Sequence, residues 1–345
     1  MSALQSVGQH QPNPAIFFDT VQGYQRTFVL QAGVDLDLFT AIAKGSRTAP
    51  EIAKSCGATE RGARVLCDCL TVMGFLTKAA NRYSLTTDSA MFLDSRSPAY
   101  LGRALKFMLH PRQLENIEKL AETARNGKKV AESVELNPED PLWVEFARGM
   151  APLMMPAAQV IAQVLKPTLA SQPSPKVLDI AAGHGTFGIT VAEHFPNAQI
   201  YAMDWANVLE VAKQNAKSRG VLQRYHAMPG SAFEVAWGSG YDAVLLTNFL
   251  HHFDPETNTA LLKKAYAALN PGGQVVILEF VPNDDRVSPP GPAMFSLVML
   301  ASTPQGDAYT LSQHSQTCRS AGFEEPRLIP LQGLPQSLII TTKPA

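Results

Sequence analysis

The C-terminal half of the chain alternates short apolar runs with longer segments of helical spacing. The apolar runs have the length and the β-branched content of buried strands. We predict strands at residues 176–181, 198–203, 224–228, 241–247, 274–281, 326–331 and 337–342. We predict helices at residues 186–194, 206–218, 256–269 and 311–321. This alternation predicts an α/β fold, a parallel seven-stranded sheet covered on both faces, whose last two strands form an antiparallel hairpin at one edge.

The N-terminal third has a mostly helical pattern. Residues 34–43 are predicted to form a helix whose inward side chains are Leu36, Phe39 and Ile42. Thr48 and Glu51 have the spacing of a capping box and predict the start of a second helix. A third helix over residues 59–73 and a hairpin of residues 76–78 and 83–85 follow. Three helices and a hairpin in this order are typical of a winged helix.

A second helical stretch separates these two patterns. It covers residues 100–165, and the Ser/Pro-rich segment 171–175 after it has the composition of a linker. A chain of 345 residues is long enough for two domains. We therefore predict a winged-helix-like unit at residues 1–109, a helical connector at 110–170 and a Rossmann-like unit at 171–345.

Composition and charge exclude several classes of protein. A net charge of −1 provides no field to hold nucleic acid or an anionic membrane. The predicted third helix has only Arg61 and Arg64 as basic residues, so we expect a dimerisation module instead of a DNA-binding one. The 4 cysteines lack the spacing of zinc ligands, and no apolar run has transmembrane length. We expect a cytoplasmic protein with reduced cysteines, no metal and no membrane partner.

A glycine turn follows the first predicted strand of the C-terminal half. Gly183, Gly185 and Gly188 match the pattern GxGxxG, and the absence of a following Gly-Lys-Ser/Thr excludes a P-loop. Small residues there allow a ligand to lie against the backbone. Asp204, at the end of the second strand, can accept the hydroxyl groups of a ribose. The turn therefore predicts a nucleoside-containing ligand, either a dinucleotide or an adenosine derivative.

Asp179 separates these two ligands. It lies inside the first strand, close to the turn, where a carboxylate would repel a diphosphate and attract an ammonium or sulfonium group. The segment resembles the class I S-adenosylmethionine-dependent methyltransferases, which implies S-adenosyl-L-methionine as cofactor. A nicotinamide-dependent oxidoreductase is the alternative. Further candidate contacts at the same strand ends are Trp205, Ser231, Ala232, Phe233 and Asn248.

Two histidines and a glutamate lie at the same edge of the predicted sheet. His251 and His252 follow the fourth strand, and Glu279 closes the fifth. A histidine there can remove a proton from a hydroxyl group while a methyl group is transferred. A carboxylate beside it can hold the imidazole in the useful tautomer. We predict His251 as a general base and His252 as a wall of the substrate site, and the spacing alone leaves open whether Glu279 orients His251 or is a solvated acid at a strand end.

The segment around these histidines narrows the resemblance. Leu250-His251-His252-Phe253-Asp254-Pro255-Glu256 is similar to a segment of the small-molecule O-methyltransferases of the caffeate and acetylserotonin type, in particular their bacterial members. The resemblance covers nearly the whole chain. It implies an N-terminal winged-helix dimerisation domain, a homodimer, a Rossmann-like catalytic domain, His251 as base with Glu279 beside it, and no metal.

Three departures from this family are visible in the sequence. Ser231 replaces an aspartate of the glycine turn that meets adenine, and Ser296 replaces an acid between the phenylalanine and leucine of another motif. A second acid that supports the base in plant members is absent near Ala308, where only Asp307 is close. His251 is therefore expected to have less support than in the plant enzymes, so that catalysis depends more on proximity.

The predicted reaction is O-methylation of a small aromatic or partly apolar hydroxyl compound. The expected substrate-binding residues are His252 and the apolar side chains Phe146, Met150, Met154, Phe295 and Met299. Two alternatives stay open. One is methylation of carbon or nitrogen, with His251 orienting the acceptor, and the other is a winged-helix ligand sensor that has lost catalysis.

Overall fold

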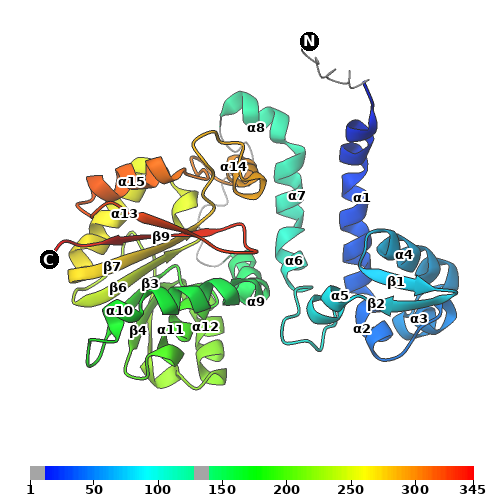
Figure 1. The fold of residues 1–345 in the computed structure, drawn as a ribbon, viewed down its shortest axis with the longest axis horizontal. Coiled ribbons are helices and arrows are strands. Elements are labelled where there is room, and N and C mark those ends of the chain that lie inside the picture. Colours follow the sequence, from blue (N-terminus) through cyan, green and yellow to red (C-terminus); the bar gives the residue numbers. More distant parts are fainter. Residues whose placement is uncertain (1–11, 128–139) are drawn as a thin grey trace, which may run out of the picture. The chain divides into compact units, whose positions relative to one another are not determined.

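The computed structural model describes residues 12–127 and 140–345, which form two compact units, 1–102 and 103–345 (Figure 1). The helical connector expected at 110–170 thus falls, where described, within the second unit, and the three-part division stays a prediction. No helix of the described residues is long and apolar enough to cross a membrane.

The first unit contains the predicted three helices and hairpin, preceded by one further helix and followed by another. Its elements are α1 (Ala15–Asp35), α2 (Leu38–Ala43), α3 (Ala49–Cys56), α4 (Glu60–Val72), β1 (Leu76–Ala79), β2 (Arg82–Leu85) and α5 (Thr87–Phe92). The capping box of Thr48 and Glu51 starts α3, and Thr59 caps α4 by accepting a hydrogen bond from the Gly62 N–H. The core of this unit contains Leu38, Phe39, Ile42, Ile52, Leu70 and Tyr83.

The helix expected at residues 34–43 is wrong in one respect. The chain leaves α1 at Asp35, passes through Asp37 with φ 49°, and starts α2 at Leu38. A left-handed residue cannot continue a right-handed helix, so the segment belongs to two helices. The inward positions are nevertheless correct for Phe39 and Ile42, which are fully buried, and Leu36 packs against the same core.

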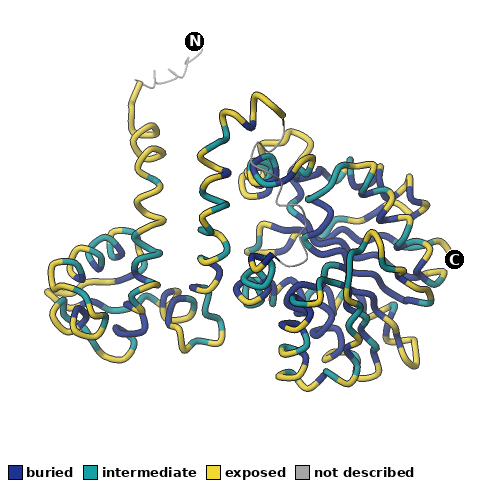
Figure 2. The backbone as a smooth tube through the Cα atoms, turned by 180° about the vertical axis from the view of Figure 1, so that it is seen from behind, coloured by how far each residue is buried: buried dark blue, intermediate teal, exposed yellow. Residues whose placement is uncertain are grey.

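Helix α1 carries an apolar surface. Much of α1 is exposed (Figure 2). Its large exposed apolar side chains are Ile16, Phe17, Phe18, Val21, Tyr24 and Phe28. Large exposed apolar patches are typical of interaction surfaces.

The second unit begins with helices and continues as an α/β sheet. The helices are α6 (Ala104–Met108), α7 (Pro111–Glu118), α8 (Leu120–Asn126), α9 (Pro141–Val164) and α10 (Lys166–Leu169). The strands are β3 (Lys176–Ile180), β4 (Gln199–Asp204), β5 (Tyr225–Pro229), β6 (Tyr241–Thr247), β7 (Leu269–Glu279), β8 (Arg327–Pro330) and β9 (Ser337–Thr342). The remaining α-helices are α11 (Thr186–His194), α12 (Ala206–Ser218), α13 (Pro255–Ala268), α14 (Pro290–Ser302) and α15 (Leu311–Ser320). The sequence pattern did not predict α14.

The seven strands have the order β5-β4-β3-β6-β7-β9-β8. The first four pairings are parallel, and β9 pairs antiparallel with both β7 and β8, which confirms the predicted edge hairpin. Side chains of a strand alternate between the two faces. On β3, Val177 joins the core beneath α9, α11 and α12, whereas Leu178 and Ile180 join the core beneath α13 and α15.

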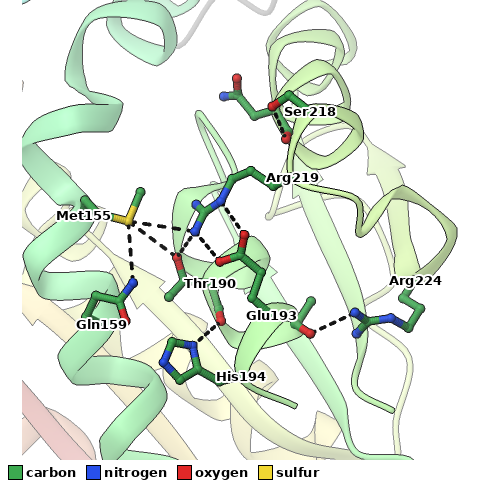
Figure 3. A network of polar contacts seen from close by, with 10 residues as sticks. Met155, Gln159, Thr190, Glu193, His194, Ser218, Arg219 and Arg224 are labelled. Atoms are coloured by element: carbon green, nitrogen blue, oxygen red, sulfur yellow. Dashed lines mark hydrogen bonds and ion pairs between the residues drawn. The ribbon is translucent and has the colours of Figure 1, made fainter. Parts of the chain in front are cut away.

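A polar cluster ties α9 to the helices on its face of the sheet (Figure 3). Arg219, just after α12, donates a hydrogen bond to Glu193 of α11 and another of 3.3 Å to the Thr190 hydroxyl. The Met155 sulfur of α9 lies 3.9 Å from both the Arg219 guanidinium and the Thr190 hydroxyl. These contacts fix α9, whose other side chains reach the candidate site.

Candidate active site

One cavity of about 970 Å³ lies within the second unit, at the carboxyl ends of the parallel strands. This is where open α/β sheets bind their ligands. Most of the predicted site residues line it: Gly183, Asp204, Trp205, Ser231, Ala232, Phe233, Asn248, His251, His252, Phe146, Met150, Met154, Phe295 and Met299. Asp179, Gly185 and Glu279 do not line it, but Glu279 accepts hydrogen bonds from Phe249 and His251, which do.

Each of the three glycines of the turn is required for a different structural reason. Gly183 has φ +56°, and a side chain there would meet no atom closer than 3.6 Å, so the turn is open toward the cavity. Gly185 has φ +73°, and an added Cβ would lie 2.7 Å from the Tyr225 hydroxyl oxygen. Gly188 lies so close to β3 and β4 that a Cβ would be 2.6 Å from a methyl carbon of Ile200. Gly183 alone therefore offers its backbone to a ligand.

The carboxylate of Asp204 closes the turn. One of its oxygens accepts a hydrogen bond of 2.8 Å from the Gly183 N–H, and the other accepts one of 2.7 Å from the Trp205 N–H. Burial raises the pKa of Asp204 to about 6. Each carboxylate oxygen can accept a second hydrogen bond, so Asp204 can still receive hydroxyl donors from the cavity.

Asp179 corrects the electrostatic argument made from the sequence. It points to the same face as Val177, beneath α11, where one carboxylate oxygen accepts a hydrogen bond of 3.1 Å from the Gly188 N–H and the other has no partner within the described residues. Burial raises the pKa of Asp179 to about 8. Asp179 does not line the cavity, and its contact with Gly188 fastens the start of α11 to β3.

His251 and Glu279 form a buried polar pair. The imidazole Nδ1 lies 2.7 Å from a carboxylate oxygen of Glu279, and both side chains are buried. The other Glu279 oxygen accepts hydrogen bonds from the backbone N–H groups of Phe249 and His251, at 3.0 and 3.2 Å. In the neutral imidazole, a carboxylate in this position favours the tautomer with the proton on Nδ1, which leaves Nε2 unprotonated. The pair thus has the geometry of a base and its orienting acid.

Aromatic rings surround the imidazole of His251. The ring centroid of Phe295, on α14, lies 5.0 Å away in an edge-to-face arrangement, and Phe280 stacks on Phe295 at 3.7 Å. The ring of His252 lies 4.3 Å from that of His251. Burial, together with the neighbouring His251, lowers the pKa of His252 well below its usual range. His252 is therefore a neutral polar wall, next to the ring of Trp143.

Helix α9 provides the opposite wall of the cavity. Phe146, Met150 and Met154 all line it, and Met154 lies with its sulfur 3.5 Å from the Asn248 side-chain nitrogen. Asn248 has φ 51°, and its side-chain oxygen is buried with no partner among the described residues. A strained residue with an unpaired polar atom at a cavity wall is a typical feature of a ligand site.

The structure also locates the residues that depart from the family pattern. The Ser231 hydroxyl accepts a hydrogen bond of 3.2 Å from the Phe233 N–H, and Ser296 does not line the cavity. The carboxylate of Asp307 binds Arg286 at 2.8 Å instead of His251. The backbone N–H of Asp307 does donate a hydrogen bond of 3.0 Å to the His251 carbonyl oxygen. No second acid within the described residues contacts the His251 ring through a hydrogen bond.

Sequence reasoning missed several residues of the cavity wall. They are His184, Trp143 and Phe107, and on α7 Arg112, Gln113 and Asn116. His184 lies between two glycines of the turn, where its Nδ1 accepts a hydrogen bond of 3.1 Å from the Thr186 N–H, and burial lowers its pKa to about 4. Its position in the turn was the signal that could have found it. Arg112 and Asn116 are four residues apart, which is the spacing of one helix face.

The comparisons with known proteins agree with this geometry. Residues 140–324 match the O-methyltransferase domain, and residues 18–95 match the O-methyltransferase dimerisation domain. The chain belongs to the O-methyltransferase family. The chain is therefore an S-adenosylmethionine-dependent methyltransferase with a class I fold, as expected from the glycine turn and the segment around His251.

Individual relatives extend over most of the chain. A crystal structure of a candidate O-methyltransferase from Nostoc punctiforme is 47% identical, with a TM-score of 0.90, and covers 97% of this chain and 100% of its own. The 3-hydroxy-5-methyl-1-naphthoate 3-O-methyltransferase of Streptomyces sahachiroi is 27% identical over 92% of this chain and 91% of its own length. The L-tyrosine C(3)-methyltransferase of Streptomyces lavendulae is 26% identical over 91% and 88%.

The residues present fit S-adenosylmethionine. The Gly183 backbone is open to the cavity, the Asp204 carboxylate lies at its wall, and the unpaired oxygen of Asn248 is buried there. Hydroxyl and ammonium groups are donors that such oxygens accept. The cavity volume of about 970 Å³ leaves room for a second small molecule beside the cofactor.

Proposed function

We propose that the protein methylates a hydroxyl oxygen of a small aromatic or partly apolar metabolite, with His251 as the general base. The observation that supports this most strongly is the buried pair of His251 Nδ1 and the Glu279 carboxylate, at 2.7 Å, beside an aromatic-walled cavity. A ligand sensor without catalysis would have no need of an oriented base.

The proposed step requires little of the protein beyond alignment and one proton transfer. When bound, S-adenosylmethionine would supply an electrophilic methyl group on its sulfonium sulfur, and breaking of that carbon–sulfur bond would leave S-adenosylhomocysteine. Glu279 holds the Nδ1 proton, so the Nε2 lone pair of His251 accepts the proton of the acceptor hydroxyl while its oxygen forms the bond to the methyl carbon. Glu279 stabilises the imidazolium that results.

The cofactor contacts are proposed from the wall of the cavity. Asp204 accepts the ribose hydroxyls, Gly183 and Asn248 lie against the amino-acid part, and Trp205 with Ala232 and Phe233 packs near the adenine. Ser231 offers the adenine a neutral hydrogen-bonding group. Gly185 and Asp179 act indirectly, by fixing the turn to α12 and β3.

The acceptor site is proposed to lie between α9, α14 and the two histidines. Phe146, Met150 and Met154 cover one side of it, and Phe295 and Met299 cover the other. His252 is neutral and polar, so it can donate or accept one hydrogen bond. This arrangement supports a flat, partly apolar acceptor.

We further propose a cytoplasmic homodimer formed through the first unit. The match to a dimerisation domain and the exposed apolar side chains of α1 support it. A second copy of α1 is the simplest surface to cover this group. Size-exclusion chromatography with light scattering tests the oligomeric state.

Methylation of carbon is the second candidate function. It is favoured by the likeness to the L-tyrosine C(3)-methyltransferase, at 26% identity. Mass spectrometry of the labelled product decides between carbon and oxygen.

Substitution of His251 by Ala tests the proposed base. The variant should bind S-adenosylhomocysteine like the wild type and lose most of its turnover, since a positioned base contributes about 10²–10⁴-fold to the rate. Turnover within a few fold of the wild type would remove the assigned role.

A further inference from the structure

Helix α7 contributes a polar patch to the largely aromatic wall of the cavity. Arg112, Gln113 and Asn116 all line it. Arg112 and Asn116 are four residues apart and lie on the same helix face. We call these two side chains, together with Asp140, the α7 cradle. Arg112 and Asn116 lie on α7, whereas His251 follows β6.

The side-chain amide of Asn116 contributes no hydrogen bond to the described part of the fold. The relative exposure of Asn116 is 7%, and its side chain forms no hydrogen bond with any residue of 12–127 or 140–345. Asn116 lines the cavity, and its amide atoms are not among the fully enclosed polar atoms that lack a partner, so they are accessible. An accessible amide without a protein partner at a cavity wall is a candidate binding group for a molecule in the cavity.

Arg112 is held in place by a buried acid. Its Nη1 donates a hydrogen bond to the Asp140 carboxylate, whose other oxygen caps α9 by accepting a hydrogen bond of 3.0 Å from the Leu142 N–H. Asp140 is 5% exposed. The guanidinium has five N–H donors, and its Nε and Nη2 groups have no partner among the described residues. The cradle therefore has several spare donors.

The net charge of the α7 cradle decides whether it binds a carboxylate or an uncharged carbonyl oxygen. The positive charge of Arg112 is already balanced by Asp140. A carboxylate bound there would add a second, unbalanced negative charge close to a buried one, which is unfavourable. An uncharged carbonyl oxygen accepts the same N–H donors without this cost.

We propose that the α7 cradle binds a carbonyl oxygen of the methyl acceptor, such as that of a ketone, quinone or amide, while the reacting hydroxyl lies at His251. This inference rests on the proposed function and narrows it to one chemical class. Asn116 donates from its amide and Arg112 from its free N–H groups, while the aromatic side chains hold the ring between the cradle and His251.

A matched series of acceptors tests the proposal. The series has the regioisomers of naphthol, acetylnaphthol and hydroxynaphthoate, which carry hydrogen, a neutral carbonyl or a carboxylate at the same positions. Each is titrated by calorimetry into full-length protein saturated with S-adenosylhomocysteine, and kcat/KM is measured with S-adenosylmethionine. At least one acetylnaphthol should bind on the order of tenfold more tightly than its parent naphthol and than the matching hydroxynaphthoate.

Variants of Asn116 identify the group responsible. Asn116→Asp keeps the shape and removes the donors, and Asn116→Leu removes both donors and acceptor. Each should abolish the preference for the carbonyl and leave the affinity for naphthol within twofold. Glu118→Gln, on the exposed side of the same helix, is the matched control and should change neither affinity.

The outcomes separate this proposal from the function on which it rests. Wild-type protein that binds S-adenosylhomocysteine but shows no preference for acetylnaphthol overturns the cradle alone. Preference for hydroxynaphthoate, or an equal loss of naphthol and acetylnaphthol binding in both Asn116 variants, also overturns it. Wild-type protein that binds no S-adenosylhomocysteine overturns the proposed function and the cradle together.

Discussion

Glu279→Gln is expected to lower turnover sharply while cofactor binding stays intact. Glu279 uses both carboxylate oxygens, one for the His251 Nδ1–H and one for the backbone N–H groups of Phe249 and His251. A glutamine has only one oxygen. If the glutamine oxygen keeps the hydrogen bonds from the backbone, the glutamine NH₂ group faces Nδ1. The imidazole must then carry its proton on Nε2, and Nε2 cannot take the proton of the substrate hydroxyl.

The magnitude follows from the hydrogen bond that is lost. A hydrogen bond to a charged group is worth about 1.5–3 kcal/mol, which corresponds to a decrease in kcat of about 12- to 160-fold. Loss of the charge that stabilises the imidazolium acts in the same direction. The acceptor KM should change less than kcat, since Glu279 does not line the cavity.

The assay measures S-adenosylhomocysteine formation at saturating cofactor over a range of pH, together with thermal unfolding. Glu256→Gln, an exposed glutamate in the first turn of α13, is the matched control and should behave like the wild type. A kcat for Glu279→Gln within twofold of the wild type, in protein that is folded at the assay temperature, would refute the assignment of Glu279 as the orienting acid.

Three further changes have distinct readouts. Burial raises the pKa of Asp179 to about 8, whereas the pKa of an unfolded aspartate is about 4. Between these pH values the unfolded chain has lost a proton that the folded protein keeps. The free energy of unfolding therefore falls as the pH rises from about 4 to about 8. Asp179→Asn cannot ionise, so its free energy of unfolding relative to the wild type should rise from about pH 4 to about pH 8, and a constant difference would contradict the argument. Gly306→Ala should lower kcat with unchanged S-adenosylhomocysteine affinity, because a Cβ there would lie 2.2 Å from the His251 carbonyl oxygen; normal turnover would show that the contact is not needed. Thr48→Ala should reduce the free energy of unfolding of the full chain by about 1 kcal/mol in chemical denaturation, without changing kcat.

Local signals in the sequence predicted most of the fold. The helix at residues 206–218 and the strand at 241–247 were placed correctly to the residue, because each is bounded by clear polar or glycine positions. The break between α1 and α2 was missed because Asp37 takes a left-handed conformation, and the sequence has no glycine at this position to indicate one. Helix α14 was missed because its residues, Pro290–Ser302, are apolar on most sides and have no helical period to detect.

The candidate site was predictable only where it follows the strand ends. His251, Glu279 and Asp204 come directly after or at the end of strands that meet at one edge, so their topology brings them together. The direction of Asp179 could have been predicted from its spacing of two residues from Val177, which places both on the same face of β3. Asn116 could not, because nothing in a short polar helix indicates that one of its faces lines a cavity.

The central claim, that the cavity above β3 and β4 holds S-adenosylmethionine, is tested most directly by titrating ligand-stripped wild-type protein with S-adenosylhomocysteine in a calorimeter, beside Asp204→Ala. The account predicts saturable binding with one site per chain, weakened on the order of tenfold in the variant by the loss of hydrogen bonds to a carboxylate. A wild-type titration without heat and without a shift in melting temperature would contradict it.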